Sequence, residues 1–171
     1  MAFLFVPKMI FIGTNDEYWT VDAIKHYYDQ IPGKNMIHYV PNAGHSLGGG
    51  KQAFESLSAF FGITISNKEY PVPSWTISDS NTGAELAINV NKTDLVEVNL
   101  WETTSTDKDF RNNLWLNKRL KITDSPQIKV SKSYPQKGNQ AFYVDLKYKD
   151  PNGGFYSVCT RVFTTDSKKL W

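Results

Sequence analysis

The sequence is poor in several features that would point directly to a function. It contains one cysteine in 171 residues, which excludes an internal disulfide. The formal net charge is +2, with 4 basic and 5 acidic residues in positions 1–66 and 15 basic and 12 acidic residues in positions 67–171. Neither part has the basic excess that is typical of nucleic-acid-binding proteins. No apolar run approaches the roughly 20 residues needed to cross a bilayer, so we expect neither a nucleic-acid partner nor a membrane span.

Signals for cofactors and export are also missing. No metal-ligand spacing and no phosphate-binding loop occurs, so no cofactor is expected. The apolar segment Met1–Ile12 lacks both a basic leading segment and a small-residue cleavage site, so it does not read as a signal peptide. The chain starts almost directly in a strand of buried type, and we therefore expect a fragment of a longer protein. The single Cys159 lies in an alternating run and is expected to be a small buried residue.

The first part of the chain, residues 1–66, predicts an α/β arrangement. Met9–Ile12 and Met36–Val40 are short apolar runs, typical of parallel strands covered on both faces. Residues 20–31 carry apolar side chains at helical spacing and end at Pro32-Gly33. Gln52–Phe61 predicts a second helix. The apolar side of that helix is expected to consist of Phe54, Leu57, Phe60 and Phe61.

The second part, residues 67–171, predicts an all-β domain. After a proline-rich linker at residues 68–73, the apolar residues alternate with a period of two. We expect strands near Trp75–Asp79, Ala84–Val90, Leu95–Thr103, Trp115–Ile122, Gln127–Ser133, Gln140–Lys149 and Tyr156–Thr165. About seven short antiparallel strands in a hundred residues favour a β-sandwich of fibronectin type III or immunoglobulin character. The fold class is thus α/β plus all-β.

Two residues could carry chemistry together. Asp16 follows the first predicted strand, and His45 follows the second, 29 residues later. The carboxyl ends of parallel strands form the edge at which open α/β sheets place their sites. An acid followed by a histidine is the order found in α/β-hydrolases, where the acid orients the imidazole. Each residue alone could be an ordinary loop residue, but the pair predicts the acid and base of a catalytic triad.

The nucleophile of such a triad is not evident. Residues 44–48 read Gly-His-Ser-Leu-Gly and match the G-x-S-x-G elbow of lipases. However, residues 41–43 separate this motif from the preceding strand, and no histidine follows Ser46. His26 and His38 precede it and are expected to be surface or packing residues. We interpret Ser46 as a loop residue and expect the serine elsewhere.

Several other residues permit two interpretations. Glu17, Tyr18 and Trp19 could line the mouth of a pocket or simply pack within a loop. Trp101 and Trp115 are expected to be core residues rather than a ligand platform. The charged cluster at residues 107–111 is expected to be a solvated turn or a local Arg–carboxylate pair.

A family resemblance accompanies these motifs. Lys8–Trp19, Ile31–Lys34 and Val40–His45, with Asp109–Arg111 followed by Trp115, resemble the PhoPQ-activated pathogenicity-related protein family. The resemblance implies an α/β-hydrolase-like protein, secreted or in the cell envelope of bacteria, with an appended β-domain and an undefined substrate. It also implies that Asp16 is the triad acid, that His45 is the base, and that the serine lies on an earlier strand.

The sequence therefore predicts the C-terminal fragment of a secreted serine hydrolase that is inactive by itself. Its expected partners are the missing N-terminal hydrolase segment, a protein or glycan bound by the β-sandwich, and a second copy paired through an edge strand. A non-enzymatic interaction module on a degenerate hydrolase scaffold is the alternative.

Overall fold

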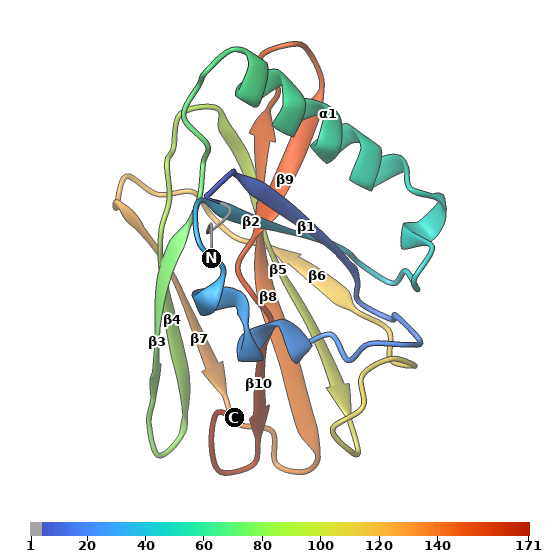
Figure 1. Cartoon of the computed structure of the whole chain (residues 1–171). Coiled ribbons are helices and arrows are strands. Elements are labelled where there is room, and N and C mark those ends of the chain that lie inside the picture. The colour runs from blue at the N-terminus through green and yellow to red at the C-terminus, as the bar shows by residue number, and fades with distance from the viewer. Residues whose placement is uncertain (1–4) are drawn as a thin grey trace.

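The computed structural model describes residues 5–171, which form two β-sheets and one α-helix (Figure 1). The α/β plus β composition expected from the sequence is confirmed at this level. The strands are β1 Lys8–Gly13, β2 Asn35–Val40, β3 Ser74–Asp79, β4 Gly83–Asn89, β5 Leu95–Ser105, β6 Leu116–Arg119, β7 Gln127–Ser133, β8 Asn139–Lys149, β9 Phe155–Cys159 and β10 Phe163–Asp166. The helices are the 3₁₀ turns η1 Ala23–His26, η2 Tyr28–Gln30 and η3 Leu47–Gly49, and α1 Lys51–Ile65.

The larger sheet joins the two parts of the chain. Its strand order is β1-β2-β9-β8-β5-β6, and β10 pairs with β8. β1 and β2 are parallel, whereas all other pairs in this sheet are antiparallel. The junction between β2 and β9 is narrow, since only Ile37 and Cys159 are in register there. The division of the chain at residues 66 and 67 stays a prediction.

The smaller sheet has the order β3-β4-β7 and packs on one face of the larger sheet. Because side chains alternate along a strand, every second residue of β4 and β7 points toward β5 and β8. The main core is built from these facing side chains. It contains Leu86, Ile88 and Val130 from the small sheet and Val98, Leu100, Phe142, Val144 and Leu146 from the large one.

One strand predicted as continuous is interrupted. The expected strand Tyr156–Thr165 is present as β9 and β10, with Thr160 between them. Its backbone amide donates to the carbonyl of Val144, and its hydroxyl accepts from the amide of Val144. This exchange keeps both strands on β8 across the break. Cys159, at the end of β9, is buried as expected.

The prediction of a helix over residues 20–31 is wrong. That segment forms η1 and η2, two short 3₁₀ turns separated by Tyr27. No side chain caps either turn, and only Ile24 of η1 is buried within them. Val21 and Ile24 pack against Ile37 and Tyr39 of β2. Tertiary packing therefore satisfies the apolar residues without the regular helix that their spacing favoured.

Helix α1 forms as predicted but buries a different face. Its buried residues are Ala53, Ser56, Ala59 and Ile63, whereas Phe54 is 68% exposed and Phe61 is 54% exposed. The helix lies along β9 and β2, on the side away from β3 and β4 (Figure 1). Small side chains on this face allow a close approach of helix and strand. The phenyl rings are left on the outer side.

The strands of the first part differ in their coverage. All six residues of β2 are buried, as expected for a strand between two layers. β1 is only half-buried through most of its length, contrary to the expectation that both its faces are covered. It stands at the end of the sheet, because β9 pairs with β2 and not with β1.

Candidate active site

Asp16 lies in the turn that follows β1 and is 6% exposed. Its Oδ1 accepts hydrogen bonds from the backbone amides of Tyr18 at 2.9 Å and Trp19 at 3.3 Å. This pattern is an Asx-type turn, in which a short carboxylate satisfies amides two and three residues ahead. One carboxylate oxygen is thereby fixed by the backbone, and Oδ2 is left for a second partner.

His45 supplies that partner. It lies in the loop between β2 and α1, and its Nδ1 is 2.8 Å from Oδ2 of Asp16. Because a carboxylate only accepts, the proton of the neutral ring is on Nδ1 and the free base is Nε2. The histidine side chain is 59% exposed, and Nε2 makes no hydrogen bond within residues 5–171. The edge of the ring packs against Tyr18, with 5.1 Å between ring centroids.

The environment keeps Asp16 ionised. Burial alone would raise the pKa of its carboxyl group, but the hydrogen bonds from His45, Tyr18 and Trp19 outweigh burial and lower the pKa. The carboxylate is therefore charged at neutral pH and would stabilise a protonated imidazole. A fixed carboxylate at Nδ1 of an exposed imidazole is the geometry needed for proton transfer at Nε2.

The two loops meet because β1 ends in a residue without a side chain. A Cβ on Gly13 would lie 2.3 Å from the carbonyl oxygen of Gly44 and 2.4 Å from that of Ala43. Contacts this short are not tolerated, so any other residue would push the histidine loop away. The backbone amide of Asn15 donates to the carbonyl of Ala43 at 2.9 Å across the same gap.

Glu17 makes a second link between the loops. Its Oε2 accepts from the backbone amide of His45 at 3.1 Å. Gly44 leaves room for this carboxylate, since a Cβ there would lie 2.7 Å from Oε2. Glu17 and Tyr18 both contact His45 across the two loops, although Tyr18 is 69% exposed and Trp19 is 65% exposed, so neither aromatic ring is packed into the interior.

The β-domain also holds the histidine loop. The side chain of Asn42 forms a reciprocal pair with the backbone of Trp115, donating to its carbonyl at 3.0 Å and accepting from its amide at 2.7 Å. Asn42 has φ of 56°, a left-handed conformation that asparagine tolerates better than most residues. Trp115 is a fully buried core residue, as predicted.

The acid loop has a matching support. Asn15 donates to the backbone carbonyls of Arg111 at 2.9 Å and Asn113 at 2.8 Å. The Arg111 guanidinium donates to the carbonyl of Glu17 at 2.9 Å and pairs with Asp109 at 2.6 Å. The expected Arg–carboxylate pair is thus present, but it also reaches the acid loop. Sequence reasoning missed this role, since nothing in residues 107–115 indicates a contact nearly a hundred positions away.

Ser46 does not have the geometry of a nucleophile elbow. Its φ and ψ are −71° and 0°, an ordinary helical conformation without the strain of an elbow. It precedes η3 rather than ending a strand. Across residues 5–171, its hydroxyl has no hydrogen bond to an imidazole.

The remaining candidates lie elsewhere. His26 is exposed on η1, and His38 is buried on β2, where it contacts Ser56 of α1. Trp101 is only half-buried, at the edge of the cluster around Trp115, so it is less of a core residue than expected. Within residues 5–171, no group of three or more His, Cys, Asp or Glu side chains could hold a metal ion. Nor does this region contain a helix long and apolar enough to cross a membrane.

Comparison with known proteins gives one match. The family model described as PhoPQ-activated pathogenicity-related protein matches residues 1–111, which include both site loops and the supporting Asp109–Arg111. No curated protein matches the chain. No solved structure matches it either.

Proposed function

Since this chain belongs to the PhoPQ-activated pathogenicity-related protein family, we propose that Asp16 and His45 are the acid and base of a serine hydrolase. One observation carries this proposal. The buried Asp16 carboxylate holds Nδ1 of His45 at 2.8 Å, while the histidine side chain is 59% exposed and its Nε2 makes no hydrogen bond within residues 5–171. The nucleophilic serine belongs to a preceding segment of the full-length protein, which completes the site.

The proposed chemistry is acyl transfer. His45 Nε2 takes the proton of the serine hydroxyl as the serine oxygen attacks the carbonyl carbon of an ester or related acyl substrate. The proton then passes from Nε2 to the leaving group as the bond to the carbonyl carbon breaks. Water then attacks the acyl-serine with the same help from His45, which releases the acid and restores the serine. Asp16 stays ionised throughout and stabilises the imidazolium.

The test compares this chain with the full-length protein. We expect the 171-residue chain to neither hydrolyse short p-nitrophenyl esters nor react with a fluorophosphonate probe. The full-length protein is expected to label on one serine and to lose the label when His45→Gln is introduced. His26→Gln is the matched control, because His26 is exposed and remote from the dyad. Labelling of the isolated chain that disappears with Ser46→Ala would overturn the proposal.

The alternative is a non-enzymatic interaction module on a degenerate hydrolase scaffold. It is supported by the strand order of the β-domain, in which β3-β4-β7 face β6-β5-β8 with β9 and β10 alongside. That order is compatible with a sandwich of fibronectin type III character, a fold used widely for binding. A full-length protein with the serine that fails both to label and to turn over esters would favour this alternative.

The free edge of β1 supports a further part of the proposal. Among the described strands β1 pairs only with β2, so the outer edge of residues 9–13 has no strand partner within residues 5–171. We propose that a strand of the preceding hydrolase segment occupies this edge, and that the isolated chain dimerises through it instead. A concentration-independent monomeric mass in light scattering would contradict the dimer.

Secretion or an envelope location is proposed from the family alone.

A further inference from the structure

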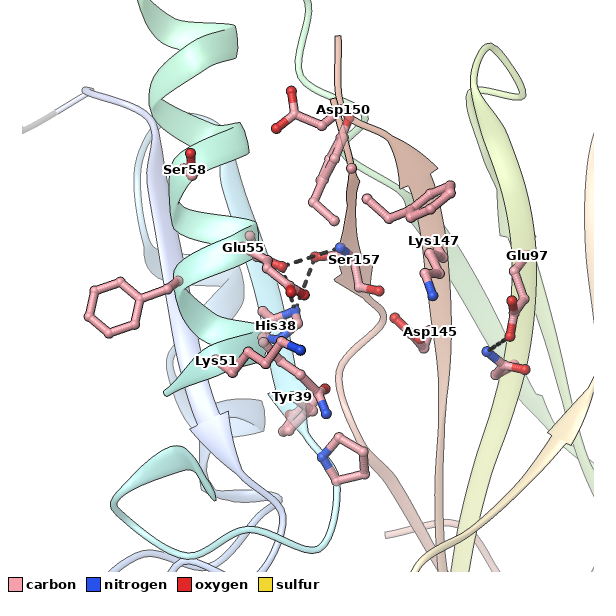
Figure 2. A pocket seen from close by; sticks show the side chains of 18 of the residues that line it. His38, Tyr39, Lys51, Glu55, Ser58, Glu97, Asp145, Lys147, Asp150 and Ser157 are labelled. Carbon is pink, nitrogen blue, oxygen red and sulfur yellow. Dashed lines mark hydrogen bonds between the residues drawn. The ribbon is translucent and has the colours of Figure 1, made fainter. Parts of the chain in front are cut away.

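A cavity lies away from the acid–base pair. It has a volume of about 920 Å³ and opens between α1 and the large sheet (Figure 2). The sheet face that forms it is the one opposite to the main core, because Val98 and Leu100 point into the core and the intervening residues point out. Its volume is within the range of about 300–1,000 Å³ usual for small-molecule sites. None of its lining residues belongs to the Asp16–His45 site.

The floor of the cavity is a set of polar side chains in cross-strand register. Glu97 on β5 is opposite Lys147 on β8, which is opposite Ser157 on β9. One step along the strands, Asn99 is opposite Asp145. Carboxylates and amides in such rows offer acceptors and donors at fixed spacing and in a common direction. Asn99 donates to Glu97 at 2.9 Å, so the floor is already partly ordered.

An aromatic ring completes the floor. Trp101 follows Asn99 on the same face of β5, and Asn117 of β6 is directly opposite it. The indole is half-buried and packs against the cluster around Trp115. A large, flat and anchored ring surrounded by carboxylates and amides suits a ligand that has one apolar face and a polar rim.

The wall of the cavity contains a buried polar atom without a partner. His38 is 3% exposed, and its Nδ1 lies 3.2 Å from the carbonyl oxygen of Ser157. Oγ of Ser56 lies at the same distance from Nδ1, and Nε2 has no hydrogen-bond partner within residues 5–171. Burial lowers the pKa of His38, which keeps the ring neutral at pH 7. Such an orphan atom is costly unless a ligand or water forms a hydrogen bond with it.

The charge of the lining excludes an anionic ligand. Four acidic side chains line the cavity against two basic ones, which are Glu55, Glu97, Asp145 and Asp150 against Lys51 and Lys147. A phosphate or carboxylate group would meet repulsion from this excess of carboxylates, whereas hydroxyl groups can donate to the carboxylates and accept from the lysines.

We propose that this groove binds a neutral saccharide. One ring packs its C–H face on Trp101, and its hydroxyls bond to Glu97, Asn99 and Asn117. A second ring or an exocyclic hydroxyl reaches toward α1. This site is independent of the acid–base pair, so it stands whether or not the full-length protein is a hydrolase.

The test uses the whole 171-residue chain and ¹H–¹⁵N NMR. The probes are methyl glycosides of glucose, galactose, mannose and N-acetylglucosamine and the β-1,4-linked trisaccharides of glucose and N-acetylglucosamine. We expect saturable shifts with at least one of them, centred on the indole Nε1–H of Trp101 and the side-chain amides of Asn99 and Asn117. Binding should weaken about tenfold or more in Trp101→Ala, the loss typical of an aromatic anchor.

Two further variants keep the test decisive if Trp101→Ala unfolds. Asn117→Ala removes an exposed side chain at the groove and should weaken binding about threefold or more, by roughly one lost hydrogen bond. Asn81→Ala removes an equally exposed asparagine in the turn between β3 and β4 and should leave binding unchanged. The proposal fails if no saccharide shifts groove resonances, if inorganic phosphate or trilysine binds there in preference, or if Asn117→Ala behaves as Asn81→Ala does.

Discussion

Two histidines seven positions apart illustrate how environment decides what an imidazole can do. His45 is in a loop, has a carboxylate at Nδ1, and presents Nε2 to solvent. His38 is within β2, has a serine carbonyl at Nδ1, and keeps Nε2 buried. The first can gain a proton next to a negative charge, whereas the second is held neutral by desolvation.

The comparison separates the proposed base, His45, from a buried histidine that packs within the sheet. A base needs access and a charged partner, and the loop after a parallel strand supplies both. The residue type is the same, so the difference lies in the carboxylate, the exposure and the element that carries the ring.

The largest expected effect concerns the carboxylate. In the full-length protein, Asp16→Asn should slow fluorophosphonate labelling on the order of 10³–10⁴-fold, because the imidazole loses its orienting anion. His26→Gln should leave the labelling rate unchanged. The imidazole ¹⁵N shifts of His45 should also reveal a mixture of tautomers in Asp16→Asn. A variant that keeps a single tautomer and full labelling would show that Asp16 does not orient the base.

The next effect concerns the support of the histidine loop. Asn42→Ala should lower the free energy of unfolding by about 2 kcal/mol more than Asn67→Ala, measured by urea denaturation. Asn67 is a matched control, because its φ of 50° is also left-handed but its side chain makes no hydrogen bond to residues 5–171. Equal losses would mean that only backbone strain matters at Asn42, and that the pair with Trp115 contributes nothing.

A third prediction uses pH to distinguish the buried ring. The pKa of His38 is lowered by burial, so the unfolded chain binds a proton that the folded chain does not. His38 therefore makes stability fall as pH drops below about 6.5, by at most about 1.4 kcal/mol per pH unit. His38→Gln should flatten this slope, whereas His26→Gln should not. The check is urea denaturation of each variant between pH 7.5 and 5.

The last prediction concerns Asp145 in the groove. Burial raises its pKa to about 6, so the folded chain holds a proton that the unfolded chain has lost between about pH 4 and 6. Its ionisation therefore costs stability as pH rises through this window, and the cost persists above it. Asp145→Asn should stabilise the chain by at most about 3 kcal/mol at pH 7.5 and by little at pH 4, as denaturation midpoints would show. A uniform effect at both pH values would exclude ionisation as its cause.

Much of the fold could be read from the sequence because local pattern and final structure agree there. The alternation in β4, β5, β7 and β8 predicted strand bounds close to those observed, since apolar residues recur at every second position in each of these strands. The segment at 20–31 failed because periodicity reports which residues are apolar and not how the backbone satisfies them. Phe54 and Phe61 misled for a related reason, since the helix approaches its sheet through small residues and leaves its rings outside.

The site was predictable only in part. Asp16 and His45 could be singled out because each ends a strand, and parallel strands bring their ends together. Glu17 and Asn42 were not assigned roles, because their partners are a backbone amide and the backbone of Trp115, and backbone groups leave no mark on the sequence. The groove was missed because cross-strand register, which places Glu97 beside Lys147, is not encoded in either strand alone.

The reciprocal pair between Asn42 and Trp115 has a consequence for slow motions. The backbone amide of Trp115 is bonded to Oδ1 of Asn42, and its side chain is locked in the core. Its amide hydrogen can exchange with solvent only when the histidine loop lets go or the core around Trp115 opens. Deuterium uptake at this single amide therefore sets an upper limit on how often the loop that carries His45 opens.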